Sequence, residues 1–265
     1  MIWPEIPTTV APWLYYTGVG LAVLITGISK SGFGGGVGIL AIPLMAIAVD
    51  NPTHAIGITL PLLIACDLLS NLHYLKAYDW KRLSWMIPGA CVGVLLGTFI
   101  LIKLLDGHAP KDVARAMNLL IGVMCLAVVL MQVWRWAGRE IPTLPSHPLS
   151  GASVGLIAGC VSTINHSAGP ILQVYMLQEK LEKRIFVGTL VMYTLVMNSL
   201  KVPTYCYLGF INAQTLRDSI WFIPLIPLGT VAGAWMNKKM NDRVFNMVMY
   251  IATAITAAYM IYKSV

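Results

Sequence analysis

Long apolar runs separated by short polar segments dominate the chain. A bilayer hydrocarbon core of about 30 Å requires about 20 helical residues. Six runs meet that length and predict full transmembrane helices, at residues 54–75, 83–104, 115–134, 185–209, 219–237 and 244–262. Four runs are shorter, at 13–29, 37–49, 149–162 and 170–178, and we interpret the last three as too short to cross a membrane alone.

Two bends rich in Gly and Ser join the shorter runs in pairs. They are ISKSGFGGGVG at 28–38 and STINHSAGP at 162–170. Each pair predicts a re-entrant helical hairpin that returns to the side from which it entered. Irregular backbone is excluded from contact with lipid but tolerated where it is buried in protein or lines a wet cavity. The bends therefore mark a predicted interior site.

The same order of elements recurs in the two halves, which indicates an internal duplication. A shift of 131 residues places Ser31 on Ser162, Gly38 on Gly169, Gly57 on Gly188, Asp67 on Asn198 and Tyr74 on Tyr205, and a shift of 136 places Pro88 on Pro224, Gly93 on Gly229 and Gly97 on Gly233. Three full crossings in each half would invert the second half relative to the first.

The sequence thus predicts an all-α integral membrane protein with an inverted-topology repeat, each half a broken helical hairpin plus three transmembrane helices. The predicted divisions are an N-terminal lead-in at 1–12, a first repeat at 13–137, a cytoplasmic linker at 138–148 and a second repeat at 149–265. The lead-in lacks the basic segment of a signal peptide, so we expect it to stay uncleaved.

Composition excludes a soluble enzyme. The chain is 57% apolar and 11% charged, whereas a soluble domain has about 25% charged residues. The five cysteines lie in apolar runs without C-x-x-C spacing, which favours a packing role over disulfides or zinc. No cofactor and no metal site are predicted.

The distribution of Lys and Arg explains the net charge of +7 as topology, so no nucleic-acid partner is expected. Eleven of the 18 basic residues fall on the side of the loops 76–82, 135–147, 180–184 and 238–243, and five fall on the other side. By the positive-inside rule the first side is cytoplasmic. Both termini are then predicted outside the cytoplasm of a cell inner membrane.

Four ionisable residues fall at membrane depth, where charge is costly and usually functional. They are Lys30, Asp67, His166 and Lys201. The N-terminal ends of the two short helices add backbone N–H groups and positive dipole ends, which bind anions. The predicted substrate-binding residues are Ser29, Lys30, Ser31, Gly34, Gly35, Gly36, Ser162, Thr163, Asn165, His166, Ser167, Gly169, Asn198 and Lys201.

Each group receives a predicted role in holding a small anion. The two lysines neutralise it, the backbone N–H groups of Gly34–Gly36 and Ser167–Gly169 hold its oxygens, and the bend hydroxyls with Asn165 set selectivity. Asp67 or His166 carries a coupling proton, because the environment of a buried carboxylate or imidazole can shift its titration into the working pH range.

Structural alternatives stand beside these roles. Lys30 is alternatively a lysine that snorkels to the interface, and Lys201 one that lies near the outer surface. His166 is alternatively satisfied by backbone, and Asp67 is alternatively a structural partner of Lys201 or of a helix end. The glycine pairs Gly93/Gly97 and Gly229/Gly233 are interpreted as helix-packing contacts.

Several segments resemble the sulfite exporter TauE/SafE family. These are GISKSGFGGGVGILAIPL at 27–44, AIGITLPLL at 55–63, KAYDWKR at 76–82, PGACVGVLLGT at 88–98, GCVSTINHSAGP at 159–170, VGTLVM at 187–192 and PLIPLGTVAGAW at 224–235. The resemblance implies an organosulfur anion transporter of four-plus-four segments, coupled to protons in some members. The second bend departs from the family's glycine-rich pattern at Asn165 and His166, which suggests altered substrate or coupling.

The sequence and the resemblance together predict an exporter of sulfite, sulfoacetate or related organosulfonates, coupled to protons and working by alternating access. Its partners are the anion, protons and membrane lipid, and a homodimer is left open. The alternatives are an importer of the same anions and a passive anion channel. An intramembrane enzyme built on Ser162, Thr163 and His166 is disfavoured because no carboxylate is nearby in the sequence.

Overall fold

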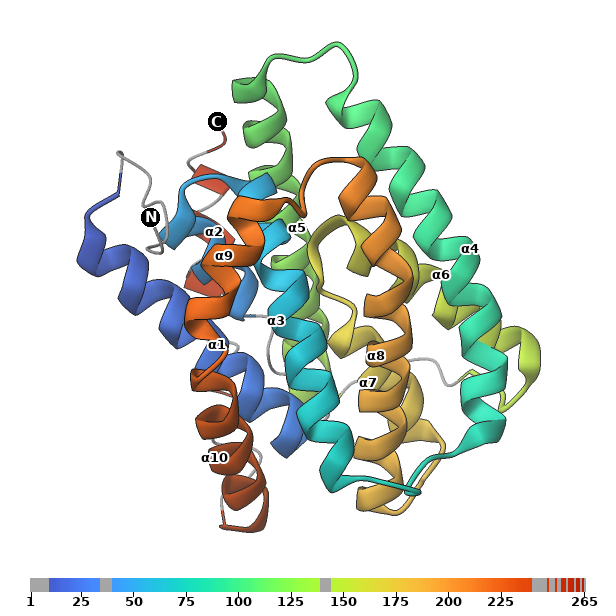
Figure 1. Ribbon diagram of the computed structural model, residues 1–265. Helices are drawn as coiled ribbons and strands as arrows, with labels where there is room; N and C mark the ends of the chain where they lie inside the picture. Colours follow the sequence, from blue (N-terminus) through green and yellow to red (C-terminus); the bar gives the residue numbers. More distant parts are fainter. Residues whose placement is uncertain are drawn as a thin grey trace.

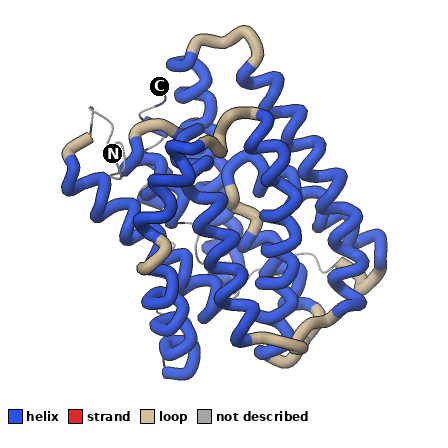
Figure 2. Tube along the Cα trace, viewed as in Figure 1, coloured by secondary structure: helices blue, strands red, loops and turns tan. Residues whose placement is uncertain are grey.

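The computed structural model describes residues 10–33, 40–138, 144–239 and scattered positions between 247 and 264. Helices joined by short loops, and no strands, make up this described part (Figures 1 and 2). The helices are α1 (Pro12–Phe33), α2 (Ala41–Val49), α3 (Pro52–His73), α4 (Trp80–Leu105), α5 (Pro110–Trp136), α6 (Pro148–Asn165), α7 (Gly169–Gln178), α8 (Lys183–Tyr207), α9 (Ala213–Phe222) and α10 (Leu225–Lys239).

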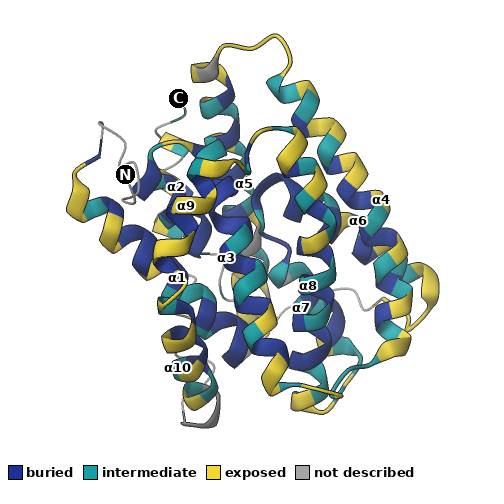
Figure 3. Ribbon diagram, viewed as in Figure 1, coloured by how far each residue is buried: buried dark blue, intermediate teal, exposed yellow. Residues whose placement is uncertain are grey.

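Six of the described helices are long and apolar enough to cross a membrane, namely α1, α3, α4, α5, α6 and α8. The pair α9 and α10 adds a seventh span if it is counted as one. Large apolar side chains are exposed on the outer helices, as at Leu95 and Leu149, which are both 70% exposed, and Figure 3 shows exposed positions along the outside of α4. A lipid environment accounts for such surfaces, so this is a multi-pass membrane protein.

Three helix boundaries differ from the sequence prediction. The expected span 219–237 is wrong as a single helix, because α9 and α10 meet at a 50° bend around Pro224. Proline removes a backbone donor and its ring clashes with the preceding turn, which breaks a helix. The segment 149–162 was expected to be too short, yet α6 continues to Asn165 and its 18 residues reach spanning length. Helix α1 continues to Phe33.

Both short partner helices are present. Helix α7 has 10 residues and follows α6 after a turn at 166–168. His166 ends α6 in the left-handed conformation, with φ of 60°. Helix α2 has 9 residues and follows α1. Gly34, Gly35, Gly36 and Gly38, which connect α1 to α2, lie outside the described residues. Residues 1–9, 139–143 and most of the expected span 244–262 lie outside them as well.

Small residues bring two helix pairs into close contact. Helix α4 packs along α6, and α1 packs along α10. A Cβ added to Gly93 would collide with the Leu156 carbonyl, and one added to Gly27 would lie 3.0 Å from the Gly229 Cα. Close backbone approach of this kind is what a G-x-x-x-G pattern permits. The interpretation of these glycines as packing contacts is confirmed.

Contacts between the two halves are reciprocal. The arm α1 packs on α10 of the second half, whereas α6 packs on α4 of the first. Gly57 in α3 abuts Phe210 after α8, and Gly188 in α8 abuts Ala77 after α3. Helices α3 and α8 contact each other and run in opposite directions (Figure 1). The two helical hairpins, α1–α2 and α6–α7, also contact this central pair, the first through α1 and α2 and the second through α7.

The two basic loops predicted on one side, 76–82 and 180–184, lie at the same end of the molecule. Arg82 at the start of α4 donates from Nη2 to Glu179 at 2.6 Å and from Nη1 to Asp79 at 2.9 Å. Glu179 directly follows α7. This ion-pair network ties the start of α4 to the end of the second hairpin.

Candidate functional site

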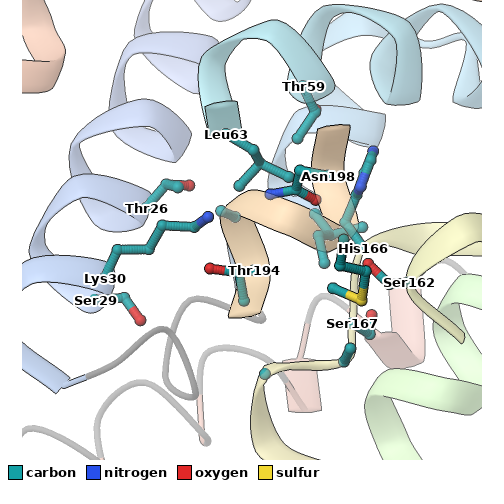
Figure 4. Close-up of a pocket in the computed structure, with 15 residues that line it drawn as sticks. Thr26, Ser29, Lys30, Thr59, Leu63, Ser162, His166, Ser167, Thr194 and Asn198 are labelled. Carbon is teal, nitrogen blue, oxygen red and sulfur yellow. The ribbon is translucent and has the colours of Figure 1, made fainter. Parts of the chain in front are cut away.

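A small pocket lies in the interior, where the two hairpins meet α3 and α8. Its lining consists of Thr26, Ser29, Lys30, Ala41, Ile42, Thr59, Leu63, Ser162, His166, Ser167, Ala168, Gly169, Thr194, Met197 and Asn198. In Figure 4, Lys30 extends from α1 toward Thr194 and Asn198. His166, Ser162 and Ser167 lie on the opposite side of these two residues from Lys30. The volume of about 50 Å³ has room for a few waters or one small polyatomic ion.

The Lys30 ammonium forms an ion pair with the Asp67 carboxylate. Asp67 on α3 is completely buried, and it also accepts hydrogen bonds from Thr194 Oγ1 at 2.8 Å and from Asn198 Nδ2 at 2.7 Å. A buried carboxylate needs this combination of a countercharge and hydrogen bonds. Lys30 is 6% exposed, so it does not snorkel, and the structural partner of Asp67 is Lys30 rather than Lys201.

Lys201 on α8 is fully buried and bonds to the other hairpin. Its ammonium donates to Ser162 Oγ at 2.9 Å and to the Ser162 carbonyl at 3.3 Å, and it lies 2.9 Å from His166 Nδ1. Because an ammonium has only donors, Nδ1 accepts and the imidazole proton lies on Nε2, which faces the Ile56 carbonyl at 3.3 Å. Lys201 is therefore away from the outer surface, and His166 bridges a lysine and a backbone carbonyl.

The predicted site residues that the structure describes fall into three groups. Those that line the pocket are Ser29, Lys30, Ser162, His166, Ser167, Gly169 and Asn198. Lys201 and Asp67 stand one contact behind them. Ser31, Thr163 and Asn165 serve the helices instead. Ser31 donates to the Thr230 carbonyl of α10 at 2.7 Å, Thr163 to Gly159, and Asn165 Oδ1 accepts from the Ser167 N–H.

The three polar pocket residues that the sequence prediction does not contain are Thr26, Thr59 and Thr194. Each lies on the helical face of a residue already singled out. Thr26 precedes Lys30 by four residues, Thr194 precedes Asn198 by four, and Thr59 precedes Asp67 by eight. Residues spaced by four share a helix face, and this spacing was the signal available in the sequence.

Charge and dipoles give the pocket a positive character. Two lysines stand against one carboxylate, Asp67. The N-terminal residues Ala41 and Ile42 of α2 and Gly169 of α7 line the pocket, so both short helices direct their positive ends toward it, as the sequence predicted. The Ser29 hydroxyl is completely buried in this wall and has no hydrogen-bond partner among the described residues.

A second buried carboxylate lies outside the pocket. Asp218 on α9 is fully buried, and its Oδ2 lies 3.0 Å from His54 Nε2 at the start of α3. Over the described residues, no group of three or more His, Cys, Asp or Glu side chains is placed to hold a metal ion. The five cysteines are free, and Cys66 and Cys125 are buried in the core.

Comparison with known proteins identifies the family. The family model of the sulfite exporter TauE/SafE matches residues 19–260. The chain belongs to the TauE/SafE family. Two curated relatives from Xylella fastidiosa, of strains Temecula1 and 9a5c, are each named "Probable membrane transporter protein". Each is 30% identical over 118 residues, which cover 43% of this chain and 43% of the relative.

No solved structure matches this TauE/SafE chain. The family description names an exporter, and the names of the two relatives describe probable membrane transporters rather than enzymes. The arrangement of Ser162 and His166 agrees with this, because both side chains contact the Lys201 ammonium.

Proposed function

We propose that this TauE/SafE family member is a secondary active transporter that exports small sulfur-containing oxyanions, such as sulfite, sulfoacetate or related organosulfonates, across the cell inner membrane. The observation that carries the proposal is the positive interior pocket, in which Lys30 and the N-terminal ends of two short helices converge. Charged side chains at membrane depth are costly and usually mark a substrate pathway.

The lining suits an oxyanion. A sulfonate or sulfite group has three oxygens that accept hydrogen bonds from fixed donors. Lys30 and the unpartnered Ser29 hydroxyl stand on α1, and Ser167 and Gly169 stand on the second bend. The volume of about 50 Å³ admits one such group and excludes a nucleotide or a lipid. The family description supports sulfite within this class.

Alternating access follows if the two halves rock about the central pair α3 and α8. The reciprocal contacts of α1 with α10 and of α6 with α4 support an inverted repeat with divisions near residues 13–137 and 149–265. Substrate sites in such carriers lie near the midplane between the repeats, at helices that are broken. The pocket is lined by the N-terminal residues of α2 and α7, which supports a substrate site of this kind.

The proposed orientation places the loops at 76–82 and 180–184 in the cytoplasm and both termini outside. The Arg82–Glu179 ion pair supports a common side for these two loops. Both loops are rich in Lys and Arg, which favours the cytoplasmic side. Cysteine accessibility labelling at Lys76→Cys and Lys111→Cys in intact cells would test this orientation, with only the second position expected to react from outside.

Flux into proteoliposomes tests the function directly. Labelled sulfite, sulfoacetate, thiosulfate and sulfate are offered to the purified full-length protein, with and without an imposed pH gradient. We expect saturable flux of at least one sulfite- or sulfonate-type anion and a response to the gradient. Failure of all four anions to move or bind would contradict the sulfur-oxyanion assignment.

An importer of the same anions uses the same pocket, so direction depends on the gradients. A passive anion channel differs in kinetics, because its flux rises without saturation and follows the electrochemical gradient of the anion alone. Accumulation of anion against its own gradient, driven by a pH step, would exclude the channel.

A further inference from the structure

Lys30 belongs to two sites at once. Its side chain lines the pocket, and its ammonium is paired with Asp67 behind the pocket wall. An anion that reaches Lys30 in the pocket places a second negative charge close to the same ammonium. Two anions close together in a buried site disfavour each other's ionised form. Anion binding and ionised Asp67 therefore compete for Lys30.

A proton on Asp67 would resolve this competition, and the surroundings can receive it. Thr194 Oγ1 lies 2.8 Å from Asp67 Oδ1 and 3.1 Å from the Val191 carbonyl. A hydroxyl both donates and accepts. When Asp67 is ionised, Thr194 donates to it. When Asp67 is protonated at Oδ1, Thr194 accepts that proton in a hydrogen bond and donates its own to Val191, so no buried polar group loses its partner.

Few other titratable groups act on Asp67. Cys66 and Lys201 lie close enough to interact with it electrostatically, and His166 faces Lys201 rather than Asp67. Helix α2 and the α10 segment Leu225–Met236 carry no charged residue, and the charges of α5 lie near its ends. On α9, Asp218 is paired with His54. Asp67 is thus the carboxylate whose protonation the anion controls.

From this geometry we infer that the anion and one proton bind the central site together, the anion at Lys30 and the proton at Asp67, and so cross the membrane in the same direction. The inference rests on the proposed function. Linkage requires reciprocity, since a proton that frees Lys30 strengthens anion binding and a bound anion strengthens proton binding. His166 is then not the coupling group, because its Nδ1 already accepts from Lys201.

This coupling remains compatible with export. A dianion carried with one proton moves one net negative charge, and an inside-negative membrane potential drives that charge outward. An inward pH gradient opposes the same movement. For a monoanion the complex is neutral, and only the two concentration gradients decide its direction.

Proton uptake on binding tests the inference without transport. Sulfoacetate or thiosulfate, whose charges are constant near neutral pH, is added to the purified full-length protein in weakly buffered detergent solution that contains a pH indicator. At a pH where Asp67 is ionised, we expect close to one proton taken up per anion bound. Over the same pH range the affinity should fall about tenfold per pH unit, as one linked proton requires.

Two variants locate the proton. In Asp67→Asn, proton uptake should disappear and the affinity should lose its pH dependence. The matched control Asp218→Asn removes the other buried carboxylate that accepts from a basic side chain and should keep the full uptake. Binding with no proton uptake, or with proton release, would overturn the inference while leaving the transporter assignment intact. Absence of binding by every anion would overturn both.

Thr194 offers a test that keeps both charges, in case Asp67→Asn does not fold. Thr194→Val removes both the donor to ionised Asp67 and the acceptor for the Asp67 proton, so uptake should fall and span a narrower pH range, whereas Thr194→Ser should restore the wild-type profile. Equal profiles in the valine and serine variants would contradict the role given to this hydroxyl.

Discussion

The two buried lysines of the central site differ in what surrounds them. Lys30 on α1 is paired with a carboxylate, Asp67. Lys201 on α8 contacts a hydroxyl, a carbonyl and an imidazole nitrogen, and it contacts no carboxylate of the described residues. Protonation can therefore change the pairing of the first lysine, whereas the contacts of the second are made by neutral groups. One half of the site can switch, and the other is a fixed donor.

The two sides of the site also differ at Asp67 and at its counterpart in the predicted repeat. In the predicted repeat, Asp67 corresponds to Asn198. The structure places these two residues in contact, with Asn198 Nδ2 donating to Asp67 Oδ2 at 2.7 Å. An amide in the second half thus stabilises the carboxylate of the first. A second carboxylate at this position would instead repel it.

The largest effect is expected from Lys30→Met, which removes the lysine whose pairing can switch. Transport should fall at least a hundredfold, because the anion loses its charged partner. The variant should also lose about 3–5 kcal/mol of stability, since Asp67 is left buried without a countercharge. Flux in proteoliposomes and thermal unfolding in detergent measure the two effects. Normal transport by this variant would contradict the charge assignment.

The double variant Lys30→Met, Asp67→Asn separates the two effects. Removing both charges leaves no uncompensated ion, so most of the lost stability should return. Transport should stay absent because no ammonium faces the anion. Recovery of transport along with stability would mean that Lys30 serves only to balance Asp67.

Lys201→Met should have a smaller effect, because it removes the fixed donor and leaves the Lys30–Asp67 pair intact. We expect anion affinity to fall about tenfold to a hundredfold, which corresponds to about 1.4–2.8 kcal/mol. The uptake of one proton per anion should persist. Loss of proton uptake in this variant, with anion binding retained, would place the coupling proton beside Lys201 and contradict its assignment to Asp67.

The sequence revealed the ionisable residues of this site but not their pairing. Lys30, Asp67, His166 and Lys201 stand out because charge is rare at membrane depth. Asp67 is 37 residues from Lys30 and 134 from Lys201, and only the packing of α1 against α3 decides between them. Sequence spacing offers no measure of that packing.

The remaining differences have local causes. The apolar run at 219–237 predicts one span by its length, whereas Pro224 within it breaks the helix and produces the bend. Thr194 does not stand out by itself in the sequence, because an uncharged hydroxyl carries little cost in a helix, where it can bond to a backbone carbonyl. The sequence prediction places Lys30 in a bend, whereas α1 continues helically through Phe33, which turns the lysine toward α3.

A moderate effect is expected from His166→Asn, which alters the fixed half without removing its lysine. Asparagine tolerates the left-handed conformation observed at this position, where φ is 60°, so the bend should form. Affinity should change only about threefold to tenfold, and the pH dependence of anion binding should be unchanged. The pH dependence is measured by titration calorimetry between pH 5.5 and 8.5, about three units around neutrality. An affinity that no longer depends on pH in this variant would show that His166 carries the coupling proton instead.

The smallest effect compares two tyrosines that correspond in the predicted repeat. Tyr205 donates from its hydroxyl to the Thr163 carbonyl at 2.8 Å, and Tyr74 donates to the Ser31 carbonyl at 2.7 Å. Tyr205 is fully buried, whereas Tyr74 is half-buried. Tyr205→Phe should therefore cost about 1–3 kcal/mol by leaving a buried carbonyl unpaired, and Tyr74→Phe about 1 kcal/mol or less because water can replace the bond. Thermal unfolding of the two variants side by side measures the difference in stability. A larger loss of stability in Tyr74→Phe would contradict the prediction that the more deeply buried hydrogen bond contributes more. Because both bonds anchor the ends of hairpin arms that carry Lys30 and Ser162, neither variant should change the number of protons taken up per anion.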